Sequence, residues 1–255
     1  MMPLITLLTD FGDRDAYVGI MKGVIASINP AITTIDLSHQ IPPQDIASAR
    51  FNLMNAVPYF PAGTVHLAVV DPGVGHTRRA IALRIAPGFL VGPDNGIFSG
   101  VLRRYPALLG VELTNHRSWS TSRPSATFHG RDIFAPAAAY LATGVELERL
   151  GTLIDTTTLV ELAIPAPIQT TAGIRGAIQY CDRFGNLVTN IPGKWVGSRN
   201  WFVNLGSLRI PGRRTYGSVE KGKPVALIGS HGWIEIAINC GHAQSQLQLK
   251  VTDPV

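Results

Sequence analysis

Short β-branched segments alternate with segments of helical apolar spacing over residues 4–143, and this alternation limits the fold more than any other feature of the sequence. Residues 4–9, 32–37 and 64–70 are predicted strands, whereas residues 17–28 carry apolar side chains at the spacing of one helix face. The other segments expected here are strands at 80–85, 89–91 and 110–113, a helix from Asp45 to Pro58, and helices at 97–105 and 131–143. Such alternation predicts an α/β fold with a largely parallel sheet.

The pattern changes after Glu161, where Ala163–Pro167 and the polar residues that follow resemble a linker. Beyond it, Gly and Pro separate short strand-like segments at 174–181, 201–205, 225–228, 233–238 and 247–251. This pattern predicts a smaller all-β, barrel-like domain. We therefore expect an N-terminal α/β domain at residues 1–163, a linker at 164–172 and a C-terminal β-domain at 173–255.

The bulk composition narrows the classes of function. The formal charge is +5, but the arginines are scattered and no basic run is interleaved with aromatic residues, so we expect no nucleic-acid partner. No apolar run approaches the roughly 20 residues of a membrane span, and the apolar start lacks the basic residues of a signal peptide. The two cysteines, Cys181 and Cys240, have neither disulfide-framework nor metal-site spacing, which favours a reducing, cytoplasmic location.

Polar, glycine-containing turns follow several predicted strands. Asp10, Asp36 with His39, and Asp71 each follow one strand, and His129 precedes the Ala-rich helix. Taken singly, each turn is an ordinary cap or chain reversal. Because ligands of open α/β sheets lie beyond the carboxyl ends of the strands, their joint position predicts a functional site there.

Several familiar motifs do not fit. The residues after Asp10 lack the glycine and terminal glutamate of an EF-hand, and the sequence has no complete dinucleotide-binding, Walker-type or Gly-x-Ser-x-Gly motif. A metal-dependent hydrolase that uses Asp10, Asp13, Asp36 and His39 is one alternative hypothesis, although we expect no resident metal. Phe128 or Trp233 could stack on a nucleobase, but aromatic residues at such positions are more often core residues.

Six motifs occur in an order that resembles the S-adenosylmethionine hydroxide adenosyltransferase family, whose relatives include fluorinase and chlorinase. They are Leu8–Gly12, Tyr17–Gly23, Asp71–Gly75 with Arg78, Pro93–Gly96, His129–Pro136, and Asp182–Asn186 with Thr189–Ile191. The resemblance covers almost the whole chain. It implies hydrolysis of S-adenosyl-L-methionine to adenosine and L-methionine, no cofactor beyond this substrate, and a homotrimer with the site at the subunit interface.

The resemblance also implies roles for individual residues. Asp71, Arg78 and His129 correspond to a water-activating triad. Asp10 corresponds to a ligand of the ribose hydroxyls, Asp182 to a residue near the methionine ammonium, and Asn186 to an adenine contact.

Further positions differ from those of the halide enzymes. His231 and Ile238 stand where fluorinase has arginines, so the contacts to the methionine carboxylate stay open. Ser230 and Glu235 are candidate substrate contacts by position only.

The chemistry of a sulfonium substrate agrees with these residue types. The sulfur leaves as a neutral thioether, so the reaction needs an activated water and no acid. By the resemblance, Asp71 stands where the halide enzymes have an uncharged residue and Gly130 where fluorinase has a serine, which favours hydroxide over halide. Which triad member takes the proton stays open, as do two alternatives: a non-catalytic S-adenosylmethionine- or nucleoside-binding protein, and a halide-using relative.

Overall fold

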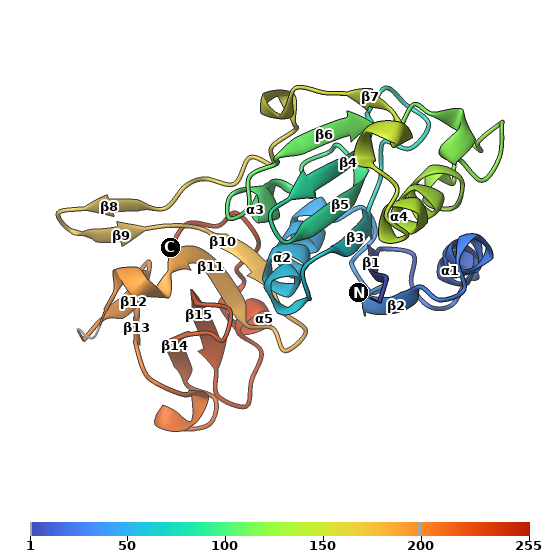
Figure 1. The fold of residues 1–255 in the computed structure, drawn as a ribbon. Helices are drawn as coiled ribbons and strands as arrows, with labels where there is room; N and C mark the ends of the chain where they lie inside the picture. The colour runs from blue at the N-terminus through green and yellow to red at the C-terminus, as the bar shows by residue number, and fades with distance from the viewer. Residues whose placement is uncertain (1, 198–199) are drawn as a thin grey trace. The chain divides into compact units, whose positions relative to one another are not determined.

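The computed structural model describes residues 2–197 and 200–255, which form two compact units, Met1–Leu162 and Ala163–Val255 (Figure 1). Each unit has its own buried apolar core. The first is an α/β layer and the second is built mainly of β-strands, so the predicted fold class is confirmed.

Within residues 2–162, seven strands form one sheet in the order β2-β1-β3-β5-β4-β6-β7. The strands are β1 (Leu4–Thr9), β2 (Thr33–Ser38), β3 (Thr64–Val69), β4 (Ala80–Ile85), β5 (Gly88–Pro93), β6 (Leu109–Glu112) and β7 (Thr152–Leu153). The first four in this spatial order are mutually parallel, whereas β4, β6 and β7 pair antiparallel. Only residues 86 and 87 join β4 to β5, and a parallel crossover needs a much longer connection, so β4 reverses direction.

Helices cover both faces of this sheet (Figure 1). Helices α1 (Tyr17–Ile28) and α4 (Ala135–Ala142) pack on one face, where Met21 and Ile25 join the core. Helices α2 (Ile46–Ala56) and α3 (Ser99–Leu102) pack on the other. A π-helical turn, Gly130–Phe134, precedes α4.

In the second unit, four antiparallel strands form a sheet in the order β10-β11-β15-β14. These strands are β10 (Ile178–Cys181), β11 (Leu187–Pro192), β14 (Pro224–Ile228) and β15 (Trp233–Ile238). Two hairpins accompany them, β8 (Ile168–Thr170) with β9 (Gly173–Arg175) and β12 (Phe202–Leu205) with β13 (Leu208–Pro211). Isoleucines from several of these strands, such as Ile178, Ile210 and Ile236, fill the core.

Three expected elements differ from the structure. The predicted strand 174–181 is interrupted at Gly176, which exchanges backbone hydrogen bonds with Val255. The predicted strand 247–251 is wrong: His242 caps a short helix, α5 (Ala243–Leu247), and Gln248 ends it in the left-handed conformation. The predicted helix 97–105 shortens to α3.

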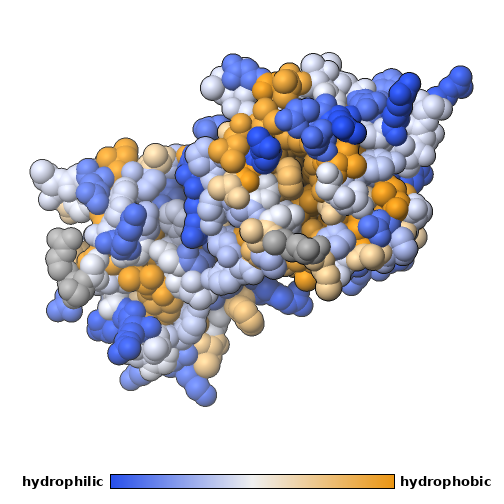
Figure 2. Space-filling view, viewed as in Figure 1, coloured by the Kyte–Doolittle hydropathy of each residue, from blue (hydrophilic) through white to orange (hydrophobic). Residues whose placement is uncertain are grey.

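The surface mixes apolar and hydrophilic side chains, as the face in Figure 2 shows for both units. Among the described residues, no helix has the length and hydropathy needed to span a bilayer.

Helix α2 begins where the sequence predicts, because the Asp45 side chain accepts hydrogen bonds from the Ser48 backbone N–H at 2.9 Å and from the Ser48 hydroxyl at 2.5 Å. Asp45→Ala is therefore expected to lower the free energy of unfolding by about 1 kcal/mol. Urea denaturation followed by circular dichroism measures the change, and Glu148→Ala, at an exposed position, serves as the control. Equal midpoints for the two variants would contradict the capping role.

Candidate active site

The loop from Asp71 to Arg78 brings a carboxylate and a guanidinium together. Arg78 donates from Nε to both Asp71 oxygens at 3.0 and 3.1 Å and from Nη2 to Oδ2 at 2.5 Å. The loop is tight: a Cβ at Gly75, which has φ +77°, would lie 2.4 Å from the carbonyl oxygen of Ala126. Position 75 therefore requires glycine, and this contact holds the loop against the segment that leads to His129.

The antiparallel direction of β4 explains why Arg78 lies here. Ala80 at the start of β4 pairs with Pro93 at the end of β5, so β4 begins at the edge where the parallel strands end. Arg78 precedes β4 by two residues and thus reaches the same edge as Asp71, which follows β3. A parallel β4 would have placed it at the opposite edge.

His129 completes the cluster from the segment before the π-helical turn. Its Nδ1 lies 2.6 Å from Arg78 Nη2. The side chains of Asp71 and Arg78 are only 6% and 11% exposed, so this contact is shielded from water. The three residues that the sequence analysis grouped are thus linked in the order Asp71, Arg78, His129.

The neighbours of His129 fix its protonation. A guanidinium can only donate, so Nδ1 accepts and the neutral ring carries its proton on Nε2. Burial lowers the pKa of His129 and the charge of Arg78 lowers it further, while Asp71 and Asp132 act in the opposite direction; the net shift is downward. The site therefore offers a carboxylate acceptor and a neutral imidazole donor.

Asp132 supports this arrangement from within the π-helical turn. Its side chain is almost fully buried and accepts hydrogen bonds from Ser125 N, from the Ser120 hydroxyl and from Arg131. Burial alone would raise the pKa of Asp132, but these hydrogen bonds and the charge of Arg131 lower it overall. The carboxylate ties the segment around His129 to the start of the turn.

Asp10 lies at the end of the adjacent strand. Thr9 pairs with Val69 in the parallel register of β1 and β3, so Asp10 and Asp71 leave the sheet at the same edge. Asp10 Oδ2 accepts the Gln44 backbone N–H at 2.8 Å. That bond uses one oxygen, and Oδ1 is available to a ligand.

The aspartate of the Pro93–Gly96 motif has a different role. Asp94 is buried, forms an ion pair with Arg79 at 2.6 Å, and accepts from Val160 N at 2.9 Å. Neighbouring arginines thus engage two different carboxylates, and Asp94 acts as a structural anchor.

In the second unit, Asp182 and Asn186 form one turn. Asn186 donates to Asp182 from its backbone at 2.8 Å and from Nδ2 at 2.9 Å, and Phe184 N donates at 2.9 Å. A Cβ at Gly185 would overlap the ring of His242, so α5 holds this turn in place. The amide oxygen of Asn186 takes part in none of these bonds.

Glu235 is buried in β15 and accepts from the Tyr216 hydroxyl at 2.7 Å and from His231 Nε2 at 3.2 Å. Burial raises the pKa of Tyr216, and the hydrogen bond to Glu235 and the charges of Glu235 and Asp182 raise it further. The sequence analysis missed Tyr216, because nothing in its loop marks it as a partner of Glu235. Ser230 is exposed in the turn between β14 and β15.

His231 Nδ1 accepts the Trp233 N–H at 3.1 Å while Nε2 faces Glu235. Both ring nitrogens therefore have partners within the domain, and His231 braces the β14–β15 turn.

The alternative metal site is not assembled. Asp36 contacts Lys22 Nζ at 2.6 Å and His39 Nε2 at 3.0 Å, so its oxygens already face donors. In the part of the chain that the structure describes, no group of three or more His, Cys, Asp or Glu side chains is arranged to hold a metal ion.

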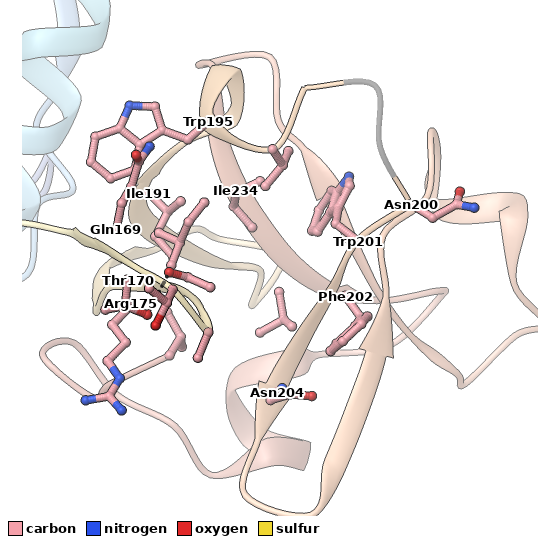
Figure 3. Close-up of a pocket in the computed structure, with 17 residues that line it drawn as sticks. Gln169, Thr170, Arg175, Ile191, Trp195, Asn200, Trp201, Phe202, Asn204 and Ile234 are labelled. Atoms are coloured by element: carbon pink, nitrogen blue, oxygen red, sulfur yellow. Dashed lines mark hydrogen bonds between the residues drawn. The ribbon is translucent and has the colours of Figure 1, made fainter.

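Phe128 is 8% exposed and packs against Phe11 and Tyr17, so it is part of the core. The second unit also has a groove of about 720 Å³, lined by Trp195, Trp201 and Phe202 among others (Figure 3). None of the four candidate residues in this unit lines it.

Comparison with known proteins agrees with this architecture. The models of the SAM hydroxide adenosyltransferase N-terminal and C-terminal domains match residues 5–151 and 176–255. An (R)-S-adenosyl-L-methionine hydrolase from Thermus thermophilus is 43% identical over 97% of this chain and 96% of its own. One from Salinispora tropica is 41% identical over 96% and 94%. A fluorinase from Actinoplanes is 27% identical over 97% and 95%.

A solved structure of an uncharacterized conserved protein from Thermotoga maritima superimposes with a TM-score of 0.91, at 35% identity and with 98% of each chain covered. An α/β unit followed by a β-unit, each matched by its own family model, defines the class of two-unit proteins to which this chain is similar. The chain belongs to the SAM hydroxide adenosyltransferase family.

The lowered pKa of His129 generates a prediction. In NMR titrations its ring is expected to titrate below the ordinary value of 6.5. Arg78→Gln removes a positive neighbour and should raise the pKa, whereas Asp71→Asn removes a negative one and should lower it further. Because the unfolded chain binds the proton more readily, His129 destabilises the fold as the pH falls below about 6.5.

The resonance of His129 is assigned by its loss in His129→Gln. A wild-type pKa at or above the ordinary value, or shifts in the same direction for both variants, would contradict the geometry.

Proposed function

We propose that this protein hydrolyses S-adenosyl-L-methionine to adenosine and L-methionine by attack of water at the ribose C5′ carbon. The observation that carries the proposal is the shielded Asp71–Arg78–His129 cluster, with Nη2 of Arg78 in contact with both other side chains. The names of the relatives with 41–43% identity agree with this activity.

The bonds and charges of the proposed reaction balance without a further reactant. The water oxygen forms a bond to C5′ as the C5′–sulfur bond breaks, and its electron pair returns to sulfur. The sulfonium becomes the neutral thioether of methionine. One water proton is released to a base and then to solvent, and the oxygen stays on adenosine as its 5′ hydroxyl.

Asp71 is the proposed base. His129 accepts through Nδ1 and carries a proton on Nε2, and Arg78 has no lone pair, so neither can take a proton in this arrangement. Asp71 Oδ1 has only a 3.1 Å contact to Arg78 Nε and can hold a water. Arg78 stabilises the developing hydroxide, and His129 Nε2–H orients the water oxygen.

The remaining candidates are assigned to substrate binding. Asp10 accepts the ribose hydroxyls through Oδ1, because a carboxylate oxygen can accept more than one hydrogen bond. The Asn186 amide oxygen accepts from the adenine amino group, and Asp182 balances the methionine ammonium. Ser230 is assigned to the methionine carboxylate, and Glu235 positions that end of the site together with Tyr216.

Hydroxide is favoured over halide as nucleophile for two reasons. The Asp71 carboxylate would repel a halide anion in the place of the water. A Cβ at Gly130 would lie 3.1 Å from Met21 Sδ and 3.2 Å from Phe128 Cε2, so a serine there would be crowded.

The first test follows the nucleophile. Incubation with S-adenosyl-L-methionine in oxygen-18 water should give adenosine labelled at the 5′ hydroxyl and unlabelled methionine, as measured by mass spectrometry. Because the names of the relatives specify the (R) form, both sulfonium epimers are tested. Retention of the substrate without product would favour the non-catalytic binding protein, and 5′-chloroadenosine formed in chloride would favour the halide reaction.

Asp71→Asn keeps the side-chain shape but removes the base, and should lower turnover by about 10²–10⁴-fold. Substrate affinity measured by calorimetry should change little. The matched control, Glu146→Gln, also removes a carboxylate paired with an arginine, but on the surface. If Asp71→Asn turns over substrate as fast as the control variant, Asp71 is not the base.

We further propose a cytoplasmic homotrimer in which each site combines Asp71 of one copy with Asp182 of the next. Asp71→Asn and Asp182→Asn should each be nearly inactive alone. Co-expressed in equal amounts, random trimers should recover roughly one quarter of wild-type turnover, because one interface in four joins two intact halves. Absence of recovery in trimers shown by light scattering to be mixed would place each site within one copy.

A further inference from the structure

Four side chains link helix α1 to the turn that carries Asp10. Lys22 Nζ lies 2.6 Å from Asp36 Oδ2, and Asp36 Oδ1 lies 3.0 Å from His39 Nε2. His39 Nδ1 lies 2.8 Å from the Thr9 hydroxyl. The sequence analysis considered Asp36 and His39 as polar residues at the strand ends and as metal ligands, and the proposed reaction uses none of the four.

The direction of these contacts is determined by their chemistry. Lys22 can only donate, and the ionised Asp36 can only accept, so a proton on His39 Nε2 is attracted to Asp36, although the 3.0 Å contact lacks hydrogen-bond geometry. His39 Nδ1 then accepts the proton of the Thr9 hydroxyl. This leaves a lone pair of Thr9 Oγ1 free to accept the Phe11 backbone N–H at 3.2 Å.

Both ends of the Asp10 turn are therefore held by His39. Its ring fixes Thr9, and its carbonyl oxygen accepts the Gly12 N–H at 2.8 Å. Asp10 lies between these two bonds, and Oδ2 is fixed by Gln44 N from the segment that follows His39. These bonds restrain the turn, and Oδ1 of Asp10 takes part in none of them.

A second threonine–histidine pair on the same strand shows what the carboxylate adds. Thr6 Oγ1 lies 2.8 Å from His66 Nδ1, but this pair is buried inside the sheet, where burial lowers the pKa of His66 to about 4. His39 instead lies at the strand end, where the Asp36 carboxylate, 3.0 Å from Nε2, favours the tautomer protonated on that nitrogen. Of these two threonine–histidine pairs, the one with ionic contacts to Asp36 and Lys22 is the pair beside the Asp10 turn.

We propose that His39, oriented by Asp36 and Lys22, is a positioning residue that fixes Asp10 for recognition of a ribose cis-diol. This inference rests on the proposed function, in which Asp10 binds the ribose hydroxyls. His39 touches no substrate atom and acts through Thr9 and the Asp10 turn.

The test is a double-mutant cycle on diol recognition, with adenosine and 2′,3′-dideoxyadenosine as calorimetric probes. Wild type should prefer adenosine by about tenfold or more, because a bond to a charged group is lost in the dideoxy analogue. His39→Ala should remove most of this preference, and Asp10→Ala all of it. In the Asp10→Ala background, His39→Ala should change the preference by less than about twofold, because the two residues act as one unit.

Two conservative variants guard against a general loss of structure. Asn Oδ1 can replace histidine Nδ1 as the acceptor from Thr9, so His39→Asn should recover part of the preference. Asp36→Asn, at a partly exposed position, should weaken it only partly. His116→Ala, a surface histidine in the same unit, should leave it unchanged, and thermal unfolding verifies that each variant is folded.

Full diol preference in folded His39→Ala, or additive effects in the cycle, would overturn the positioning role while leaving the hydrolase proposal intact. If the wild-type protein hydrolyses the substrate but shows no preference for the diol, the positioning role is also overturned, because Asp10 would then not bind the ribose. Absence of turnover in wild type would refute the proposed function itself, whatever the diol preference.

Discussion

The contact of Arg78 with both Asp71 and His129 is the interaction on which the proposed chemistry depends. A guanidinium this shielded is stable only with a carboxylate partner, since removing one member of a buried ion pair leaves an uncompensated charge. Its planar fork engages Asp71 with two nitrogens and directs the second of these to the imidazole as well. The same contact therefore orients the Asp71 carboxylate, sets the tautomer of His129 and links the two side chains.

Backbone direction makes this contact possible. The parallel strands bring Asp10 and Asp71 to one edge, but only the reversal at residues 86–87 makes β4 begin there and carry Arg78 and Arg79 to the same place. Each arginine then meets a carboxylate that follows a parallel strand, Asp71 or Asp94. At this edge of a wholly parallel sheet, only residues that follow strands would lie together. In the mixed sheet, Arg78 and Arg79, which precede β4, lie there as well.

Periodicity and turn residues were enough to predict α1, β1, β3 and the cap of α2, because these depend on local spacing and burial. The convergence of Asp71, Arg78 and His129 came from the family resemblance, since spacing in sequence does not reveal strand direction. The partnership of Tyr216 with Glu235 and the function of His39 in the Asp10 turn were missed, because both depend on contacts between distant segments. The strand expected at 247–251 failed because Leu247 belongs to α5 and Gln248 turns the chain in the left-handed conformation, which alternation does not reveal.

The charges of the proposed binding residues fit a cationic ligand. The chain is basic as a whole, yet the charged residues among the proposed substrate contacts are carboxylates, such as Asp10 in the first unit and Asp182 in the second. Within the triad the charges of Asp71 and Arg78 cancel and His129 is neutral, so the negative charge of the site comes from the binding residues. S-adenosyl-L-methionine carries a sulfonium and an ammonium against one carboxylate, and such a cation is attracted to this site. Hydrolysis turns the sulfonium into a neutral thioether, which weakens that attraction and favours release of the products.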